Sequence, residues 1–335
     1  MRPEIIKQTI KEIFKGNKSP ILLTGAPGGG KTSVVRQSAE ELKCYYIEKH
    51  LPTTLVEDFG IPNLIGRPDG DKTFDYVLPS WFPAKGSKYD DGVGGILCFD
   101  DRNQGGQELQ KVLANIQEAR NLHGVSLADG WMIVSTGNRQ QDKAGSNKVL
   151  THLADRETEL EFETHLDDWT RYAIDRDLMP EIIQFIRFRP NLLHDFDPQR
   201  SKNATPRGWE NLSNLLDCIS SEAEYEVIKG RVGEGPAAEF TGFLKIYRRL
   251  PNPDTVIMNP DSAPVPEDTA TLYALSGAIA HRATPANFKN IIKYATRLDG
   301  DFSVLTVSYA VRKNPDLADT PAFTKWIVDH EDVLF

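Results

Sequence analysis

The sequence predicts an α/β protein in which a parallel sheet is followed by an all-helical region. A short apolar run at residues 20–25 is joined by a glycine-rich loop to a helical pattern at 31–43, and two later apolar runs, at 94–102 and 131–138, end in polar residues. Short, continuously apolar runs are typical of strands that are buried on both faces of a parallel sheet. From residue 166 onward, the apolar residues instead recur at the spacing of helices.

Chain length and composition favour a globular protein with more than one domain. The chain has 335 residues, of which 39% are hydrophobic and 26% are charged, and this length exceeds that of one compact core of ordinary size. No apolar run approaches the roughly 18 residues that a membrane-spanning helix needs. An amphipathic helix without the features of a signal peptide is predicted at residues 1–16.

Charge and cysteine content indicate the class of protein and its compartment. The net charge is −9, and an acidic chain is not a natural stand-alone binder of nucleic acid or of an anionic membrane. A solvated helix end is the favoured explanation of Lys245, Arg248 and Arg249, and a local basic patch is the alternative. The three cysteines lie far apart in the sequence, which suggests a reducing compartment and no metal cluster. We therefore expect a cytoplasmic protein with no membrane segment.

The loop between the first strand and its helix has the pattern of a phosphate-binding loop. Residues 25–32 read GAPGGGKT, which fits G-x-x-x-x-G-K-[ST] between a strand and a helix. Glycines let consecutive backbone N–H groups point toward phosphate oxygens, and the helix N-terminus adds partial positive charge. Lys31 is expected to reach the β- and γ-phosphates of ATP, and Thr32 to bind Mg²⁺. The predicted nucleotide-binding residues are Gly25, Pro27, Gly28, Gly29, Gly30, Lys31, Thr32 and Ser33.

Two acidic residues follow the apolar run 96–99 within the stretch 94–102. Asp100 and Asp101 stand at the carboxyl end of this predicted strand, where the ligands of open parallel sheets gather. We expect Asp100 to hold Mg²⁺ through water and Asp101 to polarise the attacking water as a general base. Asn138 ends a neighbouring strand, where its amide could orient that water and touch the γ-phosphate; a turn-forming residue is the equal alternative.

Two further segments have open interpretations. A helix is predicted over residues 147–155, and Arg156 stands at its end before a strand at 158–163. Such an arginine is ordinary surface chemistry unless the phosphate of another subunit lies opposite it. The aromatic stretch at 74–83 forms either an inserted hairpin that packs against the domain or an exposed loop that grips a substrate chain. Its two prolines favour the packed hairpin.

Five segments, in this order, make the chain similar to AAA+ ATPases and, more narrowly, to their MoxR-type branch. They are GAPGGGKT (25–32), ILCFDD (96–101), VSTGN (134–138), LADRE (153–157) and NATPRGW (203–209). The resemblance covers residues 1–220 well and implies an AAA+ P-loop αβα sandwich over 1–165. It further implies a helical lid domain over 166–250 and a helical C-terminal extension of unknown role over 251–335.

The resemblance also implies roles for individual residues. Carried over onto matching positions, these roles are phosphate and Mg²⁺ binding by Lys31 and Thr32, metal binding by Asp100, a sensor role for Asn138, and an arginine finger at Arg156 that reaches into the ATP of a neighbouring subunit.

Arg207 resembles the lid arginine that contacts the γ-phosphate in this family. Thr205 and Pro206 are typical of a helix N-cap followed by proline at the first helical position, which would place Arg207 in the first turn. A surface cation is the alternative for Arg207.

The function that the resemblance implies is ATP hydrolysis at the subunit boundaries of a homo-oligomeric, hexameric ring that remodels a protein client, often one with a von Willebrand A-type domain. One departure affects this expectation, since the family usually has Asp-Glu where this chain has Asp100-Asp101. Asp101 is one methylene shorter than glutamate, and a misplacement of about 1 Å can cost roughly a hundredfold in rate. An ATP-binding scaffold or switch with weak turnover, and a DNA-dependent motor, therefore remain alternatives.

Overall fold

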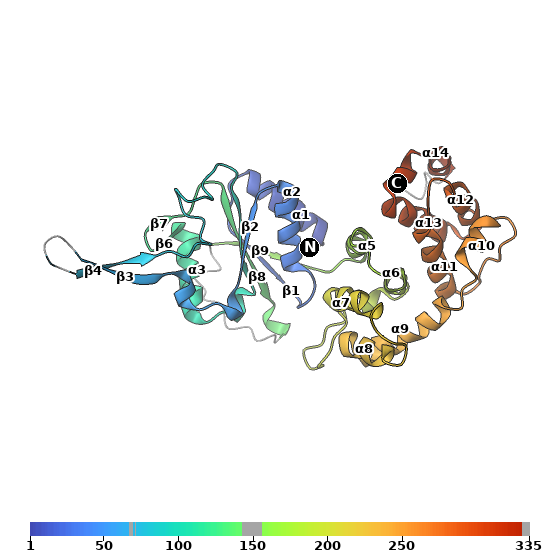
Figure 1. Ribbon diagram of the computed structural model, residues 1–335, viewed down its shortest axis with the longest axis horizontal. Helices are drawn as coiled ribbons and strands as arrows, with labels where there is room; N and C mark the ends of the chain where they lie inside the picture. The colour runs from blue at the N-terminus through green and yellow to red at the C-terminus, as the bar shows by residue number, and fades with distance from the viewer. Residues whose placement is uncertain (67–69, 71, 143–155, 330–335) are drawn as a thin grey trace. The chain divides into compact units, whose positions relative to one another are not determined.

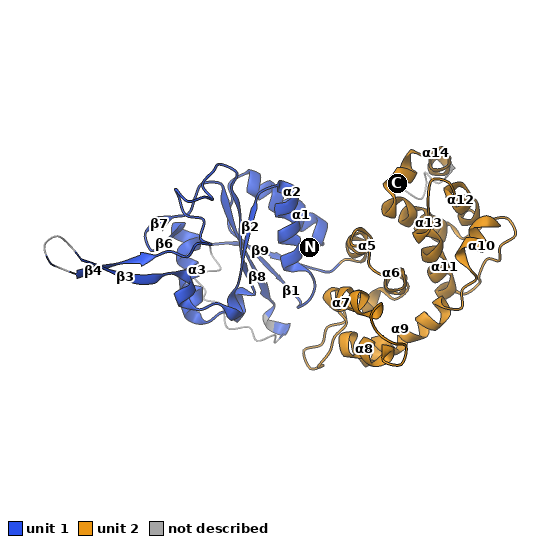
Figure 2. Cartoon of the chain, viewed as in Figure 1, with its two compact units in different colours: residues 1–164 blue, residues 165–335 orange. Residues whose placement is uncertain are grey.

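In the computed structural model, residues 1–66, 70, 72–142 and 156–329 are described, and their helices and strands are drawn in Figure 1. The chain divides into two compact units (Figure 2). Unit 1 spans Met1–Thr164 and unit 2 spans His165–Phe335. The sheets of the described chain lie in unit 1, whereas unit 2 is helical.

Unit 1 is built around a five-stranded sheet with the order β2-β5-β8-β1-β9. The strands are β1 (Ile21–Gly25), β2 (Tyr45–His50), β5 (Gly95–Asp100), β8 (Trp131–Asn138) and β9 (Thr158–Glu161). Every pair of neighbouring strands is parallel. The carboxyl ends of all five strands therefore meet at one edge of the sheet.

Helices cover both faces of this sheet (Figure 1). They are α1 (Pro3–Lys15), α2 (Lys31–Leu42) and α3 (Gln107–Ala119), and short 3₁₀ turns lie at Leu51–Thr53, Val56–Phe59, Arg102–Gln104 and Gln140–Asp142. Alternate residues of β5 enter different cores, since Ile96 and Cys98 pack with α1 and α2 while Leu97 and Phe99 pack with α3. A strand covered on both faces needs apolar residues at every position. The predicted αβα sandwich is confirmed.

Two antiparallel hairpins are inserted in unit 1. Their strands are β3 (Ile61–Gly66) with β4 (Lys72–Val77), and β6 (Asn121–Leu122) with β7 (Val125–Ser126). The β3–β4 hairpin projects away from the parallel sheet (Figure 1). At its base, the ring of Tyr76 stacks on His123 of the β6–β7 turn with a centroid separation of 3.7 Å.

The first half of residues 74–83 belongs to an inserted hairpin as predicted, but its expected packing against the domain is only partly correct, since Tyr76 stacks on His123 while its neighbours stay exposed. Phe74 and Val77 are each 58% exposed, because β4 pairs only with β3 and no further layer covers the two-stranded ribbon. Phe82, in the second half, is 2% exposed and belongs to the core shared with α3. The segment is therefore part exposed hairpin and part core.

Unit 2 is a helical unit with an extensive apolar core. Its helices are α5 (Leu166–Asp175), α6 (Pro180–Phe188), α7 (Pro206–Leu216), α8 (Glu224–Val232), α9 (Glu234–Tyr247), α10 (Pro253–Met258), α11 (Thr269–His281), α12 (Phe288–Ala295), α13 (Gly300–Lys313) and α14 (Pro321–Asp329), with 3₁₀ turns at Pro190–Leu192 and Pro315–Asp319. Ile183 of α6 and Ile279 of α11 belong to the same buried cluster. The division at residue 250 stays a prediction, and side chains from both sides of that point share this core.

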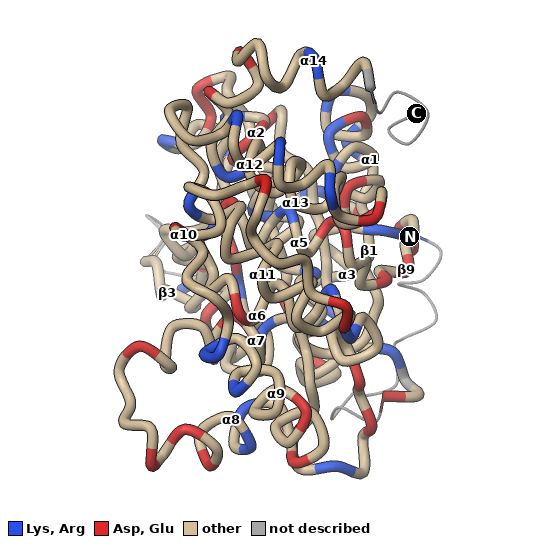
Figure 3. Tube along the Cα trace, turned by 90° about the vertical axis from the view of Figure 1, so that its right-hand side faces the viewer, with Lys and Arg blue, Asp and Glu red and all other residues tan. Residues whose placement is uncertain are grey.

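Charged residues of both signs are interspersed along the chain (Figure 3). In unit 2, Arg248 pairs with Glu224, and Arg312 donates to Asp175 over 2.8 Å. Such exposed pairs are each worth about 0–1 kcal/mol, so the buried apolar clusters dominate the stability of the unit. Among the described residues, no helix is long and apolar enough to cross a bilayer.

We expect Phe99→Ala to lower the free energy of unfolding of unit 1 by about 3–5 kcal/mol, because Phe99 is fully buried and its loss leaves a cavity against α3. Phe74→Ala is the matched control and should change it by less than about 0.5 kcal/mol, since Phe74 is 58% exposed. Urea unfolding followed by tryptophan fluorescence measures both. Equal effects of the two substitutions would contradict the burial assigned to β5 and the exposure assigned to β4.

Candidate nucleotide-binding site

The register of the parallel sheet brings the ends of four strands together. Gly25 at the end of β1 is the partner of Asn138 at the end of β8, and His50 at the end of β2 is the partner of Asp100 at the end of β5. Residues far apart in the sequence therefore meet at one edge of the sheet. This is the edge at which open parallel sheets bind their ligands.

The glycine loop has a backbone that side chains would disturb. Gly28 and Gly30 have φ values of +73° and +110°, in the left-handed region that favours glycine. A Cβ atom at Gly25 would lie 2.7 Å from the carbonyl oxygen of Phe162. Helix α2 begins directly after Gly30, so the unpaired N–H groups of its first turn belong to this loop.

Lys31 is a buried cation whose ammonium donates to oxygens of the loop and of Asn138. Its side chain is 6% exposed, and Nζ donates to the carbonyls of Gly25 (3.0 Å) and Ala26 (3.1 Å) and to Oδ1 of Asn138 (3.0 Å). A buried ammonium needs such partners, because removal from water without them is costly. The loop therefore closes around the Lys31 ammonium.

Asp100 is held as a carboxylate by three side chains. Thr32 and Thr136 donate to its Oδ1, the latter over 2.7 Å, and Nδ1 of His50 lies 3.1 Å from its Oδ2. Burial opposes ionisation of Asp100, but these hydrogen bonds outweigh it and hold its pKa below the ordinary value. The structure thus brings together Thr32 and Asp100, the two predicted metal ligands. A hydroxyl and a carboxylate are oxygen donors of the kind that Mg²⁺ prefers.

Asp101 and Asn138 are joined to the same cluster. Asp101 has a φ value of +50°, its N–H donates to Thr136 over 3.1 Å, and its Oδ1 accepts from Nδ2 of Asn138 over 3.3 Å. Asn138 therefore uses both ends of its amide, one toward Lys31 and the other toward Asp101. The backbone of Asn138 is in turn fixed by Asn103, whose amide contacts both its N–H and its carbonyl.

Arg156 lies beside a buried ion pair. Its guanidinium is 2.8 Å from the carboxylate of Glu118 on α3, and the two side chains are 29% and 60% exposed. The next residue, Glu157, pairs with Arg102, with side chains that are only 1% and 2% exposed. Burial raises the pKa of Glu157, and the nearby Arg102 opposes that rise. The helix predicted before Arg156, over 147–155, lies outside the described residues.

Arg207 lies in unit 2, in the first turn of α7 as predicted. Thr205 is the N-cap, its hydroxyl accepting from the N–H of Gly208 over 3.0 Å, and Pro206 occupies the first helical position. Arg207 is exposed. The predicted cap is confirmed, whereas the contact of Arg207 with a γ-phosphate stays a prediction.

Sequence reasoning missed several residues of the site. His50 and Thr136 contact Asp100, Asn103 fixes Asn138, and Arg102, which follows Asp101 in the sequence, pairs with Glu157. Thr136 and Asn103 each stand two residues from a predicted site residue. His50 carried no such signal, because the strand that ends in it was not assigned.

No protein-family model matches the chain, and no curated protein sequence matches it. Solved structures with low similarity include NtrX from Brucella abortus, at 14% identity and a TM-score of 0.40 over 98% of this chain and 67% of that chain. NtrX in complex with ATP gives 13% identity and a TM-score of 0.40 over 99% of this chain and 67% of that chain. The RuvB Holliday junction branch migration motor of Thermotoga maritima gives 15% identity and a TM-score of 0.40 over 82% and 81%.

The parallel sheet with helices on both faces, the glycine loop between β1 and α2, and the helical unit that comes after them form the arrangement that the resemblance to AAA+ ATPases implies. At the values given above, the similarity to solved structures by itself assigns no function.

The buried pair of Arg102 with Glu157 gives a test of this arrangement. We expect Arg102→Met to lower the free energy of unfolding by about 3–5 kcal/mol, because Glu157 then becomes an uncompensated buried charge. The double variant Arg102→Met with Glu157→Leu should recover most of that loss. Chemical unfolding measures all three proteins.

The exposed pair of Lys111 with Glu108 is the matched control, with side chains that are 58% and 69% exposed. Lys111→Met should cost less than about 1 kcal/mol. A double variant at Arg102 and Glu157 that is as unstable as the single Arg102 variant would show that lost packing, rather than unpaired charge, causes the effect.

Proposed function

We propose that this chain binds ATP with Mg²⁺ and hydrolyses it as a MoxR-like AAA+ protein, and that a ring of subunits, expected to be hexameric, remodels a protein partner. One observation carries the proposal. Asn138 joins the glycine-loop cation, Lys31, to the acid Asp101, so that a phosphate-binding element and a candidate general base form one hydrogen-bonded cluster.

Nucleotide binding follows from the contacts of Lys31. In the structure, the ammonium has two neutral carbonyl partners in the loop, at Gly25 and Ala26. Phosphate oxygens carry full charge and are stronger acceptors than carbonyls. A triphosphate in the loop would replace these two contacts and would also meet the N–H groups at the start of α2.

The residues present fit a magnesium ion. Thr32 and Asp100 would hold it, because their oxygens already lie together and Asp100 is kept ionised. When bound, Mg²⁺ neutralises charge on the phosphates during their transfer. The hydroxyl of Thr136 donates to Oδ1 of Asp100 over 2.7 Å and thereby holds the carboxylate in its orientation.

Water activation is assigned to Asp101. Asn138 donates to its carboxylate through Nδ2 and thereby orients this carboxylate to accept a proton from water. The left-handed backbone of Asp101 directs this residue out of the line of β5, which ends at Asp100. Both acids lie at the same edge of the sheet. Because aspartate is shorter than glutamate, the rate of water activation is expected to be especially sensitive to the position of the Asp101 carboxylate.

Arg156 and Arg207 are assigned to charge stabilisation at the transferred phosphoryl group, Arg156 from a neighbouring subunit. The partial exposure of Arg156 and its position next to the fixed Glu157 support the first assignment. An arginine supplied by another subunit is worth about 10³–10⁵ in rate in related systems.

The β3–β4 hairpin is the feature of the chain that favours a protein as the client. It exposes large apolar side chains over its length, a kind of surface that marks sites of protein–protein contact. These are Ile61, Leu64, Ile65, Phe74, Tyr76 and Val77. We assign this hairpin to the contact with the client or with a von Willebrand A-type partner.

We expect Lys31→Ala to weaken ATP binding by about a hundredfold or more, because two charge-assisted contacts to phosphate are lost. Isothermal titration with ATP and Mg²⁺ measures the dissociation constant. Lys18→Ala is the control, since Lys18 lies before β1 over the ring of Phe14. Wild-type protein that fails to bind ATP would overturn the proposed function.

Mixing two inactive variants tests the arginine from the neighbouring subunit. Arg156→Ala should bind ATP as the wild type does but lose turnover by about 10³ or more. Lys31→Ala protein still carries Arg156, so mixing the two variants should restore part of the ATPase rate at the boundary where Arg156 meets an intact loop.

The same experiment separates a second candidate function. A nucleotide-binding scaffold is favoured by the Asp101 side chain, which is shorter than the usual glutamate. Intact ATP binding with negligible turnover in the wild type and in every mixture would select the scaffold over the ATPase. Full turnover by Arg156→Ala alone would remove the role of this arginine.

A further inference from the structure

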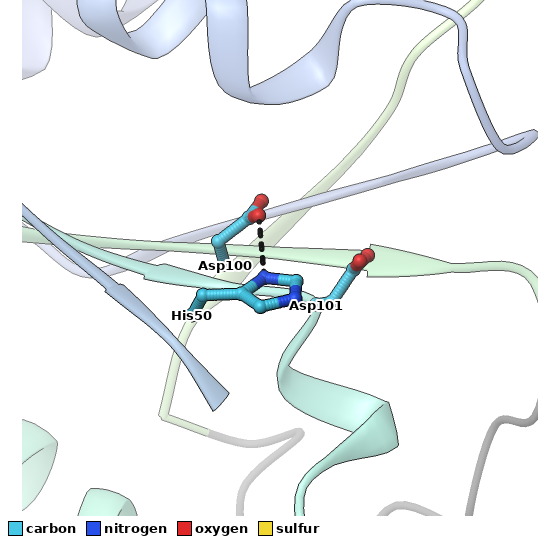
Figure 4. Close-up of side chains that lie close together, drawn as sticks. All are labelled: His50, Asp100 and Asp101. Atoms are coloured by element: carbon cyan, nitrogen blue, oxygen red, sulfur yellow. Dashed lines mark hydrogen bonds and ion pairs between the residues drawn. The ribbon is translucent and has the colours of Figure 1, made fainter. Parts of the chain in front are cut away.

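His50, Asp100 and Asp101 form a group whose ligand atoms all lie within 4.8 Å of one another (Figure 4). His50 ends β2 and the two acids end β5, and the register of these strands makes His50 the direct partner of Asp100. The sheet itself therefore fixes the imidazole beside the carboxylates. The carbonyl of His50 also accepts from the hydroxyl of Thr54 over 2.8 Å, which holds the end of β2 in place.

The Asp100 carboxylate is oriented so that one oxygen faces His50. Its Oδ1 is occupied by the hydroxyls of Thr32 and Thr136, whereas its Oδ2 lies 3.1 Å from Nδ1 of His50 (Figure 4). The side chain of His50 is 45% exposed and that of Asp100 is 14% exposed, so a cation can reach both from solvent.

The distance between the two atoms suits a shared cation. Metal–nitrogen and metal–oxygen bonds of about 2.1 Å at right angles place their ligand atoms about 3 Å apart. The observed 3.1 Å therefore suits a metal ion that is bound by Nδ1 of His50 and by Oδ2 of Asp100.

We propose that His50 is a direct ligand of the divalent cation at this edge of the sheet, and that the site consequently binds a transition-metal ion in preference to Mg²⁺, even without nucleotide. The proposal rests on the proposed function in that the same cation would accompany ATP. Carboxylates accept both classes of metal, whereas an imidazole binds transition-metal ions better than it binds Mg²⁺. Neither the glycine loop nor the acid pair requires this ligand.

Manganese provides a direct test because it is paramagnetic. Nucleotide-free, metal-stripped full chain is titrated with Mn²⁺, free Mn²⁺ is measured by electron paramagnetic resonance, and the bound ion is examined by spin-echo modulation for ¹⁴N coupling. The wild type should bind Mn²⁺ with the coupling of one coordinated imidazole. His50→Ala should lose this coupling and bind Mn²⁺ about 10–100-fold more weakly.

His123→Ala is the matched control, since this histidine stacks on Tyr76 and is not part of the group around Asp100. It should keep both the coupling and the affinity. Because the side chain of His50 is partly exposed, we expect His50→Ala to fold as the wild type does, and an unchanged melting temperature would verify this. Bound Mn²⁺ without nitrogen coupling in the wild type, or equal affinity in His50→Ala, overturns the proposal.

ATP binding in the presence of Mg²⁺, measured on the same samples, separates the two hypotheses. Intact ATP binding together with absent nitrogen coupling overturns the role of His50 and leaves the proposed function standing. Nitrogen coupling without any ATP binding supports the metal site and overturns the proposed function. If displacement of Mn²⁺ requires a tenfold or larger excess of Mg²⁺, the site prefers a transition metal. Displacement at equal concentration contradicts this preference.

Discussion

The two hydrogen bonds of the Asn138 side chain are the contacts on which the whole site depends. They connect Lys31 of the glycine loop to Asp101, which directly follows β5, inside a cluster where Asn138 itself is 5% exposed. In such surroundings a polar group that lost its partner would cost free energy, so the positions of Lys31 and Asp101 are set together. The sheet makes this possible, because β1, β5 and β8 are neighbours and end at one edge.

The helices that cover the sheet explain where its central strands are apolar and where they are polar. In β5 and in the first half of β8 the strand residues are apolar where helices cover them, and the two strands end in the polar residues Asp100 and Asn138. The β3–β4 hairpin shows the opposite case, since no helix covers it and its apolar side chains stay exposed. Helix cover thus separates the part of unit 1 that carries the candidate site from the hairpin whose apolar side chains stay exposed.

The sequence alone was sufficient for the central elements and insufficient for their partners. The glycine loop before Lys31 could be predicted, and so could the acids Asp100 and Asp101, because each directly follows a short apolar run. The local sequence pattern therefore fixes their positions. His50 could not, since its strand reads YYIEKH, is only partly buried and lacks an apolar run. Arg102 and Glu157 are 55 residues apart, and their pairing follows from which strands become neighbours, which no local pattern contains.

The ion pair of Arg102 with Glu157 has a consequence for communication between subunits. Asp101 is bonded in sequence to one member of this pair, and Arg156 to the other. In the proposed ring, Asp101 serves the nucleotide of its own subunit while Arg156 serves that of the next. If such a ring forms, a displacement of Asp101 during one turnover would pass through the buried pair to Arg156, so hydrolysis at adjacent sites would be coupled.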